Sequence, residues 1–284
     1  MRVLVLGASG MLGNAMIGVL EKNPDLEVYG STRSETGKLA FSHSLANRIT
    51  TGIDVEKIEI VNEFLQSIQP EVVINCIGLV KQLQEVNDPI HAISINSLLP
   101  HLLARECANI GARLIHFSTD CVFSGKTGNY SERDEPDAQD LYGRSKLLGE
   151  VDYPHAVTLR TSIIGRELNS KHGLVEWFLC QEGAVKGYTR AIFSGLPTCE
   201  LARVVNEFVL PRSELHGVYH VGGAPISKYD LLRLVDRIYS KGVKVIPDDH
   251  IELDRSLDSS QFSELTGYIA PNWTDLIAMM HDFQ

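Results

Sequence analysis

The sequence places a tyrosine and a lysine four residues apart, in the stretch Tyr142-Gly143-Arg144-Ser145-Lys146. If this stretch is helical, both side chains lie on one face, because residues i and i+4 are neighbours on a helix surface. A phenol ordinarily titrates near pH 10, and a nearby ammonium lowers that pKa by favouring the phenolate. The pair is therefore suited to proton transfer with a carbonyl oxygen, and Tyr142 would carry the proton.

A hydroxyl donor precedes this pair in the chain. The stretch Ala112–Ser118 is predicted to be a buried strand, and it runs into Thr119 and Asp120. A tyrosine and a lysine at this spacing also occur by chance, so their position after such a strand carries the argument. Thr119 would lie at the carboxyl edge of the sheet, where its hydroxyl can polarise a substrate carbonyl.

The first residues carry three glycines at regular spacing, Gly7, Gly10 and Gly13, between a predicted strand at Val3–Leu6 and a predicted helix at Met11–Leu20. In a dinucleotide-binding loop the first glycine permits the turn, the second lets the backbone approach the pyrophosphate, and the third allows close helix packing. The pyrophosphate then lies on free amides at the helix N-terminus. The loop residues expected to contact the cofactor are Gly7, Ser9, Gly10, Met11, Leu12 and Gly13.

The end of the second predicted strand, Leu26–Gly30, bears on which dinucleotide is bound. NAD-specific proteins place an acidic residue roughly 20 residues beyond the glycine loop. Here the strand runs into Ser31-Thr32-Arg33-Ser34 with no carboxylate, and a guanidinium suits a 2′-phosphate. The predicted cofactor is NADPH, with NADH as the alternative. Arg33 could also be a solvated surface residue.

Two further stretches could contact the cofactor. Asp54 and Val55 follow a predicted strand at Ile49–Ile53, and Asp54 could hold the adenine amino group or cap the predicted helix Val55–Ile68. A predicted strand at Glu71–Ile77 ends in residues that would lie along the cofactor at the same sheet edge, namely Cys76, Ile77 and Gly78.

Strand and helix signals alternate through the first half of the chain, which predicts a Rossmann-type doubly wound parallel sheet of the α/β class. A helix is expected from Pro89 to Ala108. The alternation weakens later, so residues 1–160 are expected to form the NAD(P)-binding domain and residues 161–284 a smaller α/β substrate-binding region interleaved with the last strands. Its predicted helices are Leu174–Gln181, Glu200–Leu210, Tyr229–Tyr239 and Trp273–Met280, with strands at Val218–Val221 and Val243–Ile246.

The composition limits the partners. Lys and Arg number 26 against 36 Asp and Glu, which gives a formal net charge of −10 and disfavours an extended nucleic-acid surface. No apolar run reaches the length of a membrane span. The 5 cysteines are scattered without metal-ligand spacing, which is typical of reduced thiols in a cytoplasmic protein. No metal site is predicted, and a homodimer is left open.

Several of these stretches together resemble the extended short-chain dehydrogenase/reductases. They are the glycine loop, Ser118 to Gly125, Tyr130-Ser131-Glu132 with Pro136, and Tyr142 to Glu150. Within that group the chain is most similar to dTDP-4-dehydrorhamnose reductases, which reduce a nucleotide-linked 4-keto-6-deoxy sugar. The similarity continues through Leu159–Ser162, Gly195–Thr198, Arg255–Asp258 and Trp273, and so covers nearly the whole chain.

The resemblance implies a role for each matching residue. Tyr142 would be the proton donor, Lys146 its partner and a ribose ligand, and Thr119 the hydroxyl that binds the carbonyl. Asn96 would support a proton relay through Lys146, unless it only makes a local bond to the backbone. Thr161 would lie near the nicotinamide.

The chain departs from the family where the substrate would bind. The usual Asn-Ala-Ala stretch is replaced by Asn75-Cys76-Ile77-Gly78, followed by Lys81, which could face the cleft or solvent. Trp177, Arg190 and Arg255 could stack on a base or bind a diphosphate, although Trp177 could equally be a core residue. The residues predicted to bind substrate are Lys81, Ser118, Thr119, Asp120, Phe123, Tyr142, Trp177 and Arg255.

The predicted substrate is a dTDP-linked 4-keto sugar used for cell-surface polysaccharide precursors, with a UDP-linked 2-acetamido-2,6-dideoxy-4-keto hexose as the alternative. Epimerases and dehydratases share the scaffold. They commonly prefer NAD, and the missing carboxylate near Arg33 counts against that cofactor. Dehydratases often carry an Asp-Glu pair after the threonine, where this chain has Asp120-Cys121. A different alternative is a non-catalytic regulator, since the β subunit of methionine adenosyltransferase resembles this family too. An intact Thr119, Tyr142 and Lys146 favours an enzyme.

Overall fold

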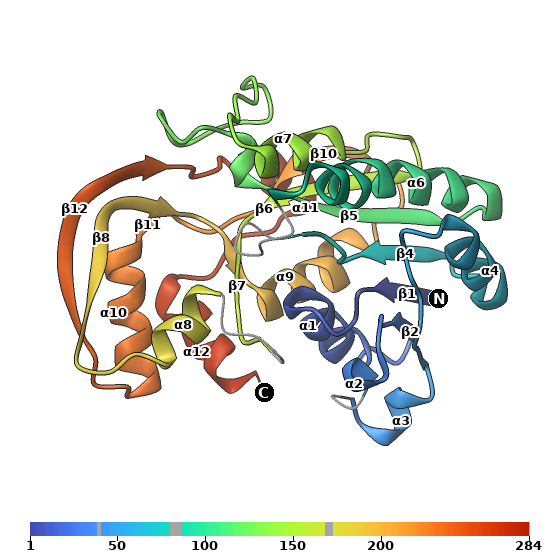
Figure 1. The fold of residues 1–284 in the computed structure, drawn as a ribbon, viewed down its shortest axis with the longest axis horizontal. Helices are drawn as coiled ribbons and strands as arrows, with labels where there is room; N and C mark the ends of the chain where they lie inside the picture. Colours follow the sequence, from blue (N-terminus) through green and yellow to red (C-terminus); the bar gives the residue numbers. More distant parts are fainter. Residues whose placement is uncertain (39–40, 80–86, 168–172, 284) are drawn as a thin grey trace.

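A computed structural model describes residues 1–38, 41–79, 87–167 and 173–283 (Figure 1). Its centre is a seven-stranded sheet in the order β10-β6-β5-β4-β1-β2-β3, in which every neighbouring pair is parallel. The predicted doubly wound Rossmann-type sheet is thereby confirmed. The strands are β1 (Arg2–Leu6), β2 (Glu27–Ser31), β3 (Ile49–Thr50), β4 (Val72–Asn75), β5 (Arg113–Thr119), β6 (Ala156–Thr161) and β10 (Gly217–His220).

The two faces of this sheet bury separate cores, because side chains alternate along each strand. Val3 and Val5 contribute to one core, whereas Leu4 and Leu6 contribute to the other. The first core is covered by α1 (Met11–Leu20), α9 (Thr198–Val204), α10 (Lys228–Tyr239) and α12 (Trp273–Asp282). The second is covered by α4 (Ile58–Ile68) and α6 (Leu99–Ile110). Both faces are therefore shielded from water, as a parallel sheet requires.

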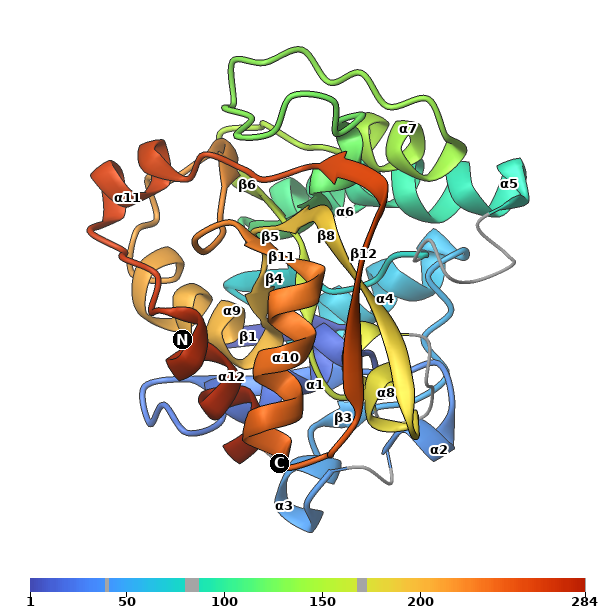
Figure 2. The same cartoon turned by 90° about the vertical axis from the view of Figure 1, so that its left-hand side faces the viewer.

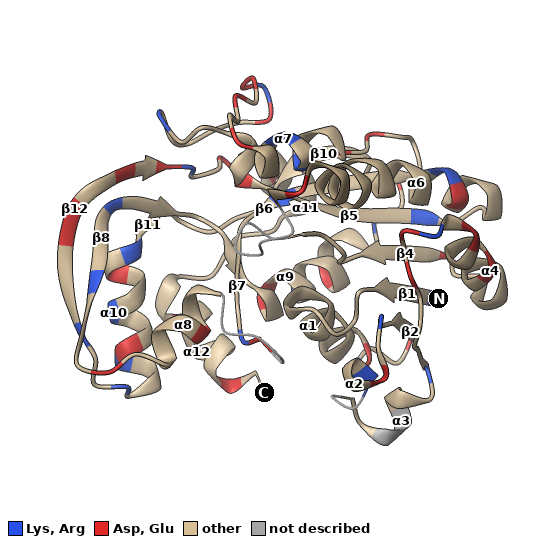
Figure 3. Cartoon of the chain, in the orientation of Figure 1, with Lys and Arg blue, Asp and Glu red and all other residues tan. Residues whose placement is uncertain are grey.

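A smaller three-stranded sheet stands beside the carboxyl edge of the large one (Figures 1 and 2). It consists of β11 (Ile226–Ser227), β8 (Ala184–Phe193) and β12 (Lys244–Asp254), and it packs against α10. Basic residues of β8 lie beside acidic residues of β12 (Figure 3), in the ion pairs of Lys186 with Asp248 and of Arg190 with Glu252. The Arg190 guanidinium is thus paired with Glu252 on the exposed face of this sheet.

The remaining elements are short. They are α2 (Glu35–Lys38), α3 (His43–Ala46), α5 (Pro89–His91), the 3-10 turn η3 (Asp120–Val122), α7 (Leu141–Leu148), β7 (Ile163–Ile164), α8 (Leu174–Leu179), β9 (Leu196–Pro197), the π-helical η4 (Val205–Val209) and α11 (Ser260–Thr266). The strand expected at Val243–Ile246 is the beginning of the longer β12. β10 comes from the second half of the chain and pairs with β6. The division at residue 160 stays a prediction.

The long helix expected from Pro89 to Ala108 contains a π-helical segment, η2 (Ala92–Leu98), between α5 and α6. Pro100 explains this irregularity, because it has no N–H for the carbonyl of Asn96 and its ring crowds that carbonyl. The space beside this carbonyl is filled by Gly149, where an added Cβ would lie 1.9 Å from the Asn96 oxygen. The end of α7 therefore packs directly on the backbone of η2.

No helix in the described part of the chain is both long enough and apolar enough to cross a membrane.

Gly149→Ala should lower the stability by about 1–3 kcal/mol, because the new methyl group overlaps the backbone of Asn96. Urea unfolding followed by circular dichroism measures the change. Gly223→Ala is the matched control, since a Cβ there would meet its nearest atom at 3.6 Å, an ordinary contact. Equal midpoints for the two variants would contradict the close packing of α7 on η2.

Candidate active site

The glycine loop has the geometry that its spacing predicts. Gly7 has φ +79°, a conformation that other residues rarely adopt, and a Cβ on Gly13 would lie 2.1 Å from the Gly7 carbonyl oxygen. The chain therefore turns sharply after β1 and α1 starts against the turn. Gly10 is the N-cap of α1, with no side-chain cap and no acidic residue in the first turn among the described residues. The amides there are available to an anionic ligand.

The loop lies beside the end of β4. A Cβ on Gly7 would come within 2.8 Å of Ile77 Cγ1 and 3.4 Å of the Cys76 carbonyl. Ser9 and Met11 are half-buried, whereas Leu12 is buried in the first core. Of the predicted loop residues, Leu12 can therefore contact a cofactor only through its backbone, because its side chain is in the core.

Arg33 is exposed just beyond the end of β2, and no bond from it to another described residue is found. The helix that follows it reaches the loop, because a Cβ on Gly37 would lie 3.0 Å from that of Ser9. Arg33 thus belongs to an exposed segment that directly precedes the contact of α2 with the glycine loop.

Asp54 heads a turn before α4. Its carboxylate accepts a hydrogen bond from the Glu56 amide at 3.2 Å and lies 3.5 Å from Lys57 Nζ. The N-cap of α4 is Lys57, so the alternative that Asp54 caps this helix is wrong; the chain makes one more turn first. Val55 packs against the second core.

The predicted catalytic residues meet at the carboxyl ends of β5 and β6. Thr119 and Thr161 are paired in register there, and both are buried. α7 is capped by Asp140, which accepts from the Gly143 amide at 2.7 Å. A Cβ on Gly143 would lie 2.2 Å from the Cys121 carbonyl, so α7 packs directly on the 3-10 turn after β5. This packing brings the Tyr142 side chain beside that of Thr119.

Burial raises the pKa of Tyr142, and the nearby Cys121 and Asp120 raise it further, while the hydrogen bond with Thr119 opposes them. Burial therefore outweighs any lowering of this pKa by the ammonium that the sequence predicts. Desolvation of the phenolate is the larger effect. The phenol is protonated at neutral pH, which is the form needed to donate a proton.

Lys146 is buried one turn along α7, and its Nζ donates to the carbonyl of Phe117 at 2.7 Å. Burial lowers the pKa of this lysine to about 8, and Glu150 partly offsets that effect. A Cβ on Gly78 would lie 3.8 Å from Lys146 Nζ and 3.5 Å from Asn96 Oδ1. The end of β4, η2 and α7 thus converge on one point.

Asn96 is fully buried, and its side chain makes long-range bonds rather than a local one. Its Oδ1 accepts from the Leu79 amide at 2.9 Å, and its Nδ2 donates to the Leu79 carbonyl at 3.3 Å and to Ser145 Oγ at 3.2 Å. It therefore ties the segment after β4 to α7. Its part in a proton relay stays a prediction.

The predicted substrate residues divide by their surroundings. Asp120 is buried against Arg255, whose guanidinium donates to the Phe123 carbonyl at 2.8 Å and to Cys121 Sγ at 3.6 Å. Phe123 is fully buried and stacks on Tyr130 at 4.2 Å, so its ring is a packing element and its predicted substrate contact does not fit.

Ser118 is also engaged, since its hydroxyl donates to Glu150 at 2.6 Å. Lys81 lies outside the described residues. Trp177 is 39% exposed, which excludes the alternative that it is a core residue.

Trp177 lines a cavity of about 390 Å³ between α8, β8 and α10. Its other lining residues are Leu174, Val185, Lys186, Tyr188, Lys228 and Leu232. Lys228 connects this cavity to the predicted catalytic residues, because its charge lowers the pKa of Asp120 against the larger effect of burial. Sequence reasoning missed Lys228, which no motif marks.

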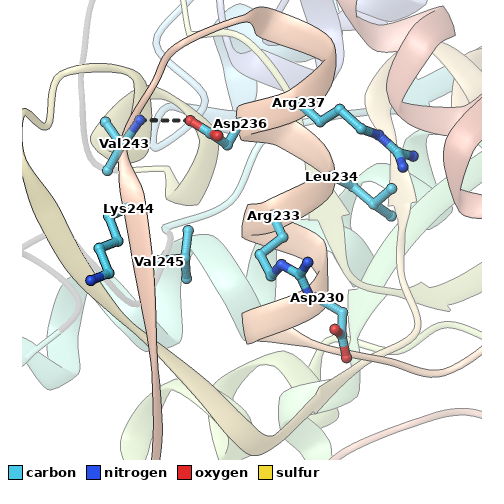
Figure 4. Close-up of a pocket in the computed structure, with 8 residues that line it drawn as sticks. All are labelled: Asp230, Arg233, Leu234, Asp236, Arg237, Val243, Lys244 and Val245. Carbon is cyan, nitrogen blue, oxygen red and sulfur yellow. Dashed lines mark hydrogen bonds between the residues drawn. The ribbon is translucent and has the colours of Figure 1, made fainter.

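A second cavity, of about 590 Å³, lies between α10 and β12 (Figure 4). Its basic side chains diverge, with Arg237 and Lys244 pointing away from each other, and Asp236 accepts from the Val243 amide at 2.8 Å. It does not converge on one ligand and is not part of the candidate site.

A comparison with protein families agrees with this site, which consists of the glycine loop, Thr119, Tyr142 and Lys146. The model of the RmlD substrate binding domain matches residues 1–276, a range that includes the glycine loop and the predicted catalytic residues. The chain belongs to this family. Its resemblance to extended short-chain dehydrogenase/reductases of the dTDP-4-dehydrorhamnose reductase type is confirmed.

Two curated relatives differ in their described roles. A probable low-salt glycan biosynthesis reductase of Haloferax volcanii is 35% identical over 169 residues, which are 58% of this chain and about half (54%) of that protein. The methionine adenosyltransferase 2 subunit beta of Danio rerio is 29% identical over 243 residues, which are 81% of this chain and 71% of that protein.

Among solved structures, the dTDP-4-dehydrorhamnose reductase of Bacillus anthracis in complex with NADP has a TM-score of 0.80 at 24% identity. The alignment covers 99% of this chain and 98% of that one. At this identity the likeness shows a shared fold.

Lys146 should titrate near pH 8, because burial disfavours its charged form. Carbon NMR of protein labelled at lysine Cε measures the titration, and Lys146→Arg assigns the resonance by removing it. A midpoint near that of a solvated lysine, about 10.4, would show that the ammonium is not desolvated.

Proposed function

We propose that the protein reduces the 4-keto group of a nucleotide-linked 6-deoxy sugar with NADPH as the hydride source. The observation that carries this proposal is the contact between Tyr142 and Thr119 at the end of β5, with the Lys146 ammonium one helical turn away. The hydroxyls of Thr119 and Tyr142 could both donate to one carbonyl oxygen. Such donors stabilise the negative charge that develops on that oxygen during reduction.

The described residues divide the proton chemistry between them. The Thr119 hydroxyl donates to the substrate oxygen and holds it beside the Tyr142 phenol. Tyr142 is protonated at neutral pH because burial raises its pKa, so it can give its proton to the forming alkoxide. The Lys146 ammonium stabilises the resulting phenolate. A nicotinamide bound at the sheet edge would supply the hydride.

The loop after β1 fits the pyrophosphate of that cofactor. The uncapped amides at the start of α1 can face phosphate oxygens, and Gly10 at the N-cap has no side chain to hold a phosphate away from the backbone. Arg33 is exposed beside this loop and supports a 2′-phosphate, hence NADPH rather than NADH. The NADP complex of the Bacillus anthracis enzyme supports the same choice.

The cavity lined by Trp177 supports a nucleotide on the substrate. Trp177 and Tyr188 offer aromatic faces to a base, and Lys228 offers positive charge to a diphosphate, whereas Lys186 is paired with Asp248. These features suit dTDP and UDP equally. We propose the dTDP-linked sugar, on the strength of the family resemblance, and a role in making precursors of cell-surface polysaccharide.

A second candidate, a regulatory subunit that binds NADP without turnover, is favoured by the match to the methionine adenosyltransferase subunit over 81% of this chain. The contact between Tyr142 and Thr119 argues for the enzyme, because a purely regulatory protein has no use for a proton donor placed beside a carbonyl-binding hydroxyl.

Tyr142→Phe should lower turnover by about 10²-fold or more and leave NADPH affinity unchanged, because only the transferred proton is lost. NADPH absorbance is followed with dTDP- and UDP-linked 4-keto sugars side by side. Tyr153→Phe, at a 40% exposed tyrosine outside the site, is the control. Wild-type turnover by the Tyr142 variant would refute the mechanism, and no consumption of any keto sugar by the wild type would favour the regulatory subunit.

Arg33→Ser should raise the KM for NADPH about 10-fold or more and leave that for NADH nearly unchanged, because it removes a charged hydrogen bond to the 2′-phosphate. Steady-state kinetics with both cofactors measures the difference. Arg48→Ser, at another exposed arginine of this region, is the matched control. A wild-type KM lower for NADH than for NADPH would overturn the role of Arg33.

A further inference from the structure

A buried carboxylate lies one helical turn beyond Lys146. Glu150 follows the end of α7, and its side chain is only 7% exposed. A carboxylate is rarely buried to this extent unless its charge is paired. Its surroundings therefore decide what it does.

Three hydrogen bonds hold this carboxylate. Arg160 binds it in a bidentate manner, with Nε 2.7 Å from Oε1 and Nη2 2.6 Å from Oε2, and Ser118 Oγ donates to Oε1 at 2.6 Å. Ser118 directly precedes Thr119, and Ser118 and Arg160 are paired in register on β5 and β6. One side chain thus connects the helix of Tyr142 and Lys146 to the strand end of Thr119.

The connection continues across the sheet edge. Arg160 Nη1 lies 3.3 Å from His220 Nε2 on β10, and His220 Nδ1 lies 2.9 Å from the Tyr130 carbonyl. Burial and the Arg160 charge lower the pKa of His220 to about 4, so this histidine is neutral near pH 7. The Arg160 guanidinium also lies over the Phe123 ring, 5.4 Å from its centroid. The carboxylate is therefore held at the end of a rigid, buried chain.

Lys146 meets few other charges. From β5 it faces the buried His116, which stays neutral because burial and the Lys146 charge lower its pKa well below the usual value. Asp120 lies in the turn that packs on α7, and Arg160 on β6 lies behind Glu150. Of these groups, Glu150 is the one whose charge counteracts the effect of burial on Lys146.

We infer that Glu150 is a positioning residue for the reaction: it binds Ser118, the neighbour of the Phe117 carbonyl that Lys146 holds, so it places a negative charge near the buried ammonium and fixes the helix of Tyr142 and Lys146 against the strand end of Thr119. This inference rests on the proposed function, because it gives Lys146 and Thr119 their roles in reduction. Glu150 reaches the reacting atoms only through these residues and does not touch the substrate.

Glu150→Gln tests the inference. It keeps the shape and one acceptor oxygen but removes the charge, so the Lys146 midpoint should fall below pH 8 in lysine Cε NMR. The alkaline limb of kcat/KM should shift downward with it, and above the midpoint the rate should fall about tenfold per pH unit. The KM for the keto sugar should change little, since no substrate contact is lost.

Three variants separate charge from packing. Glu150→Asp keeps the charge and should restore the position of the alkaline limb. Ser118→Ala removes one hydrogen bond and keeps the carboxylate, so it should leave the Lys146 midpoint in place. Arg160→Gln should move the midpoint upward, because the carboxylate is then less neutralised. A purely structural role would lower the rate in each variant without moving the midpoints in opposite directions.

The outcomes distinguish this inference from the proposed function. If Lys146 shifts as expected and no keto sugar is reduced, Glu150 sets the state of the lysine and the proposed function fails. If keto sugar is reduced and the alkaline limb of Glu150→Gln coincides with that of the wild type, the inference is wrong. If Glu150→Gln does not fold, the upward shift in Arg160→Gln carries the test, and its absence overturns the inference.

Discussion

The site depends on close approach of one backbone to another at three glycines. A Cβ would lie 2.1 Å from the Gly7 oxygen at Gly13, 2.2 Å from the Cys121 oxygen at Gly143, and 1.9 Å from the Asn96 oxygen at Gly149. These contacts pack α1 against the glycine loop. They also pack α7 against the 3-10 turn that follows β5 and against η2. Because the backbone itself makes them, the positions of Tyr142 and Lys146 follow from main-chain packing rather than from flexible side chains.

Burial then sets the protonation states of the groups held there. It raises the pKa of the phenol and lowers that of the ammonium, so both are disfavoured in their charged forms. The two effects suit a donor that starts neutral and a lysine that is still mostly charged at neutral pH but loses its proton near pH 8. The paired charges of Glu150 and Arg160 keep a carboxylate close to that lysine, where an unpaired one would be costly.

Much of the fold could be predicted because the short apolar run Val3–Leu6, buried on both faces of the sheet, and the spacing of Gly7, Gly10 and Gly13 are local signals. The π-helical η2 was missed, although Pro100 marks it. The rise in the pKa of Tyr142 on burial was not predicted, since a sequence shows which charges are near in the chain but not how deeply a phenol is buried. Glu150 could not be assigned because its partners Ser118 and Arg160 meet only through the register of β5 and β6.

The substrate half shows the limit of motif reasoning most clearly. Arg190 and Trp177 looked alike in the sequence as groups for a nucleotide, yet Arg190 pairs with Glu252 on the exposed face of β8 while Trp177 lines a cavity. Lys228, which no motif marks, lines the same cavity, and its charge lowers the pKa of Asp120, a residue far away in the sequence. The residues proposed to choose a substrate are thus placed by tertiary packing, and they can change without disturbing the backbone contacts that place Tyr142 and Lys146.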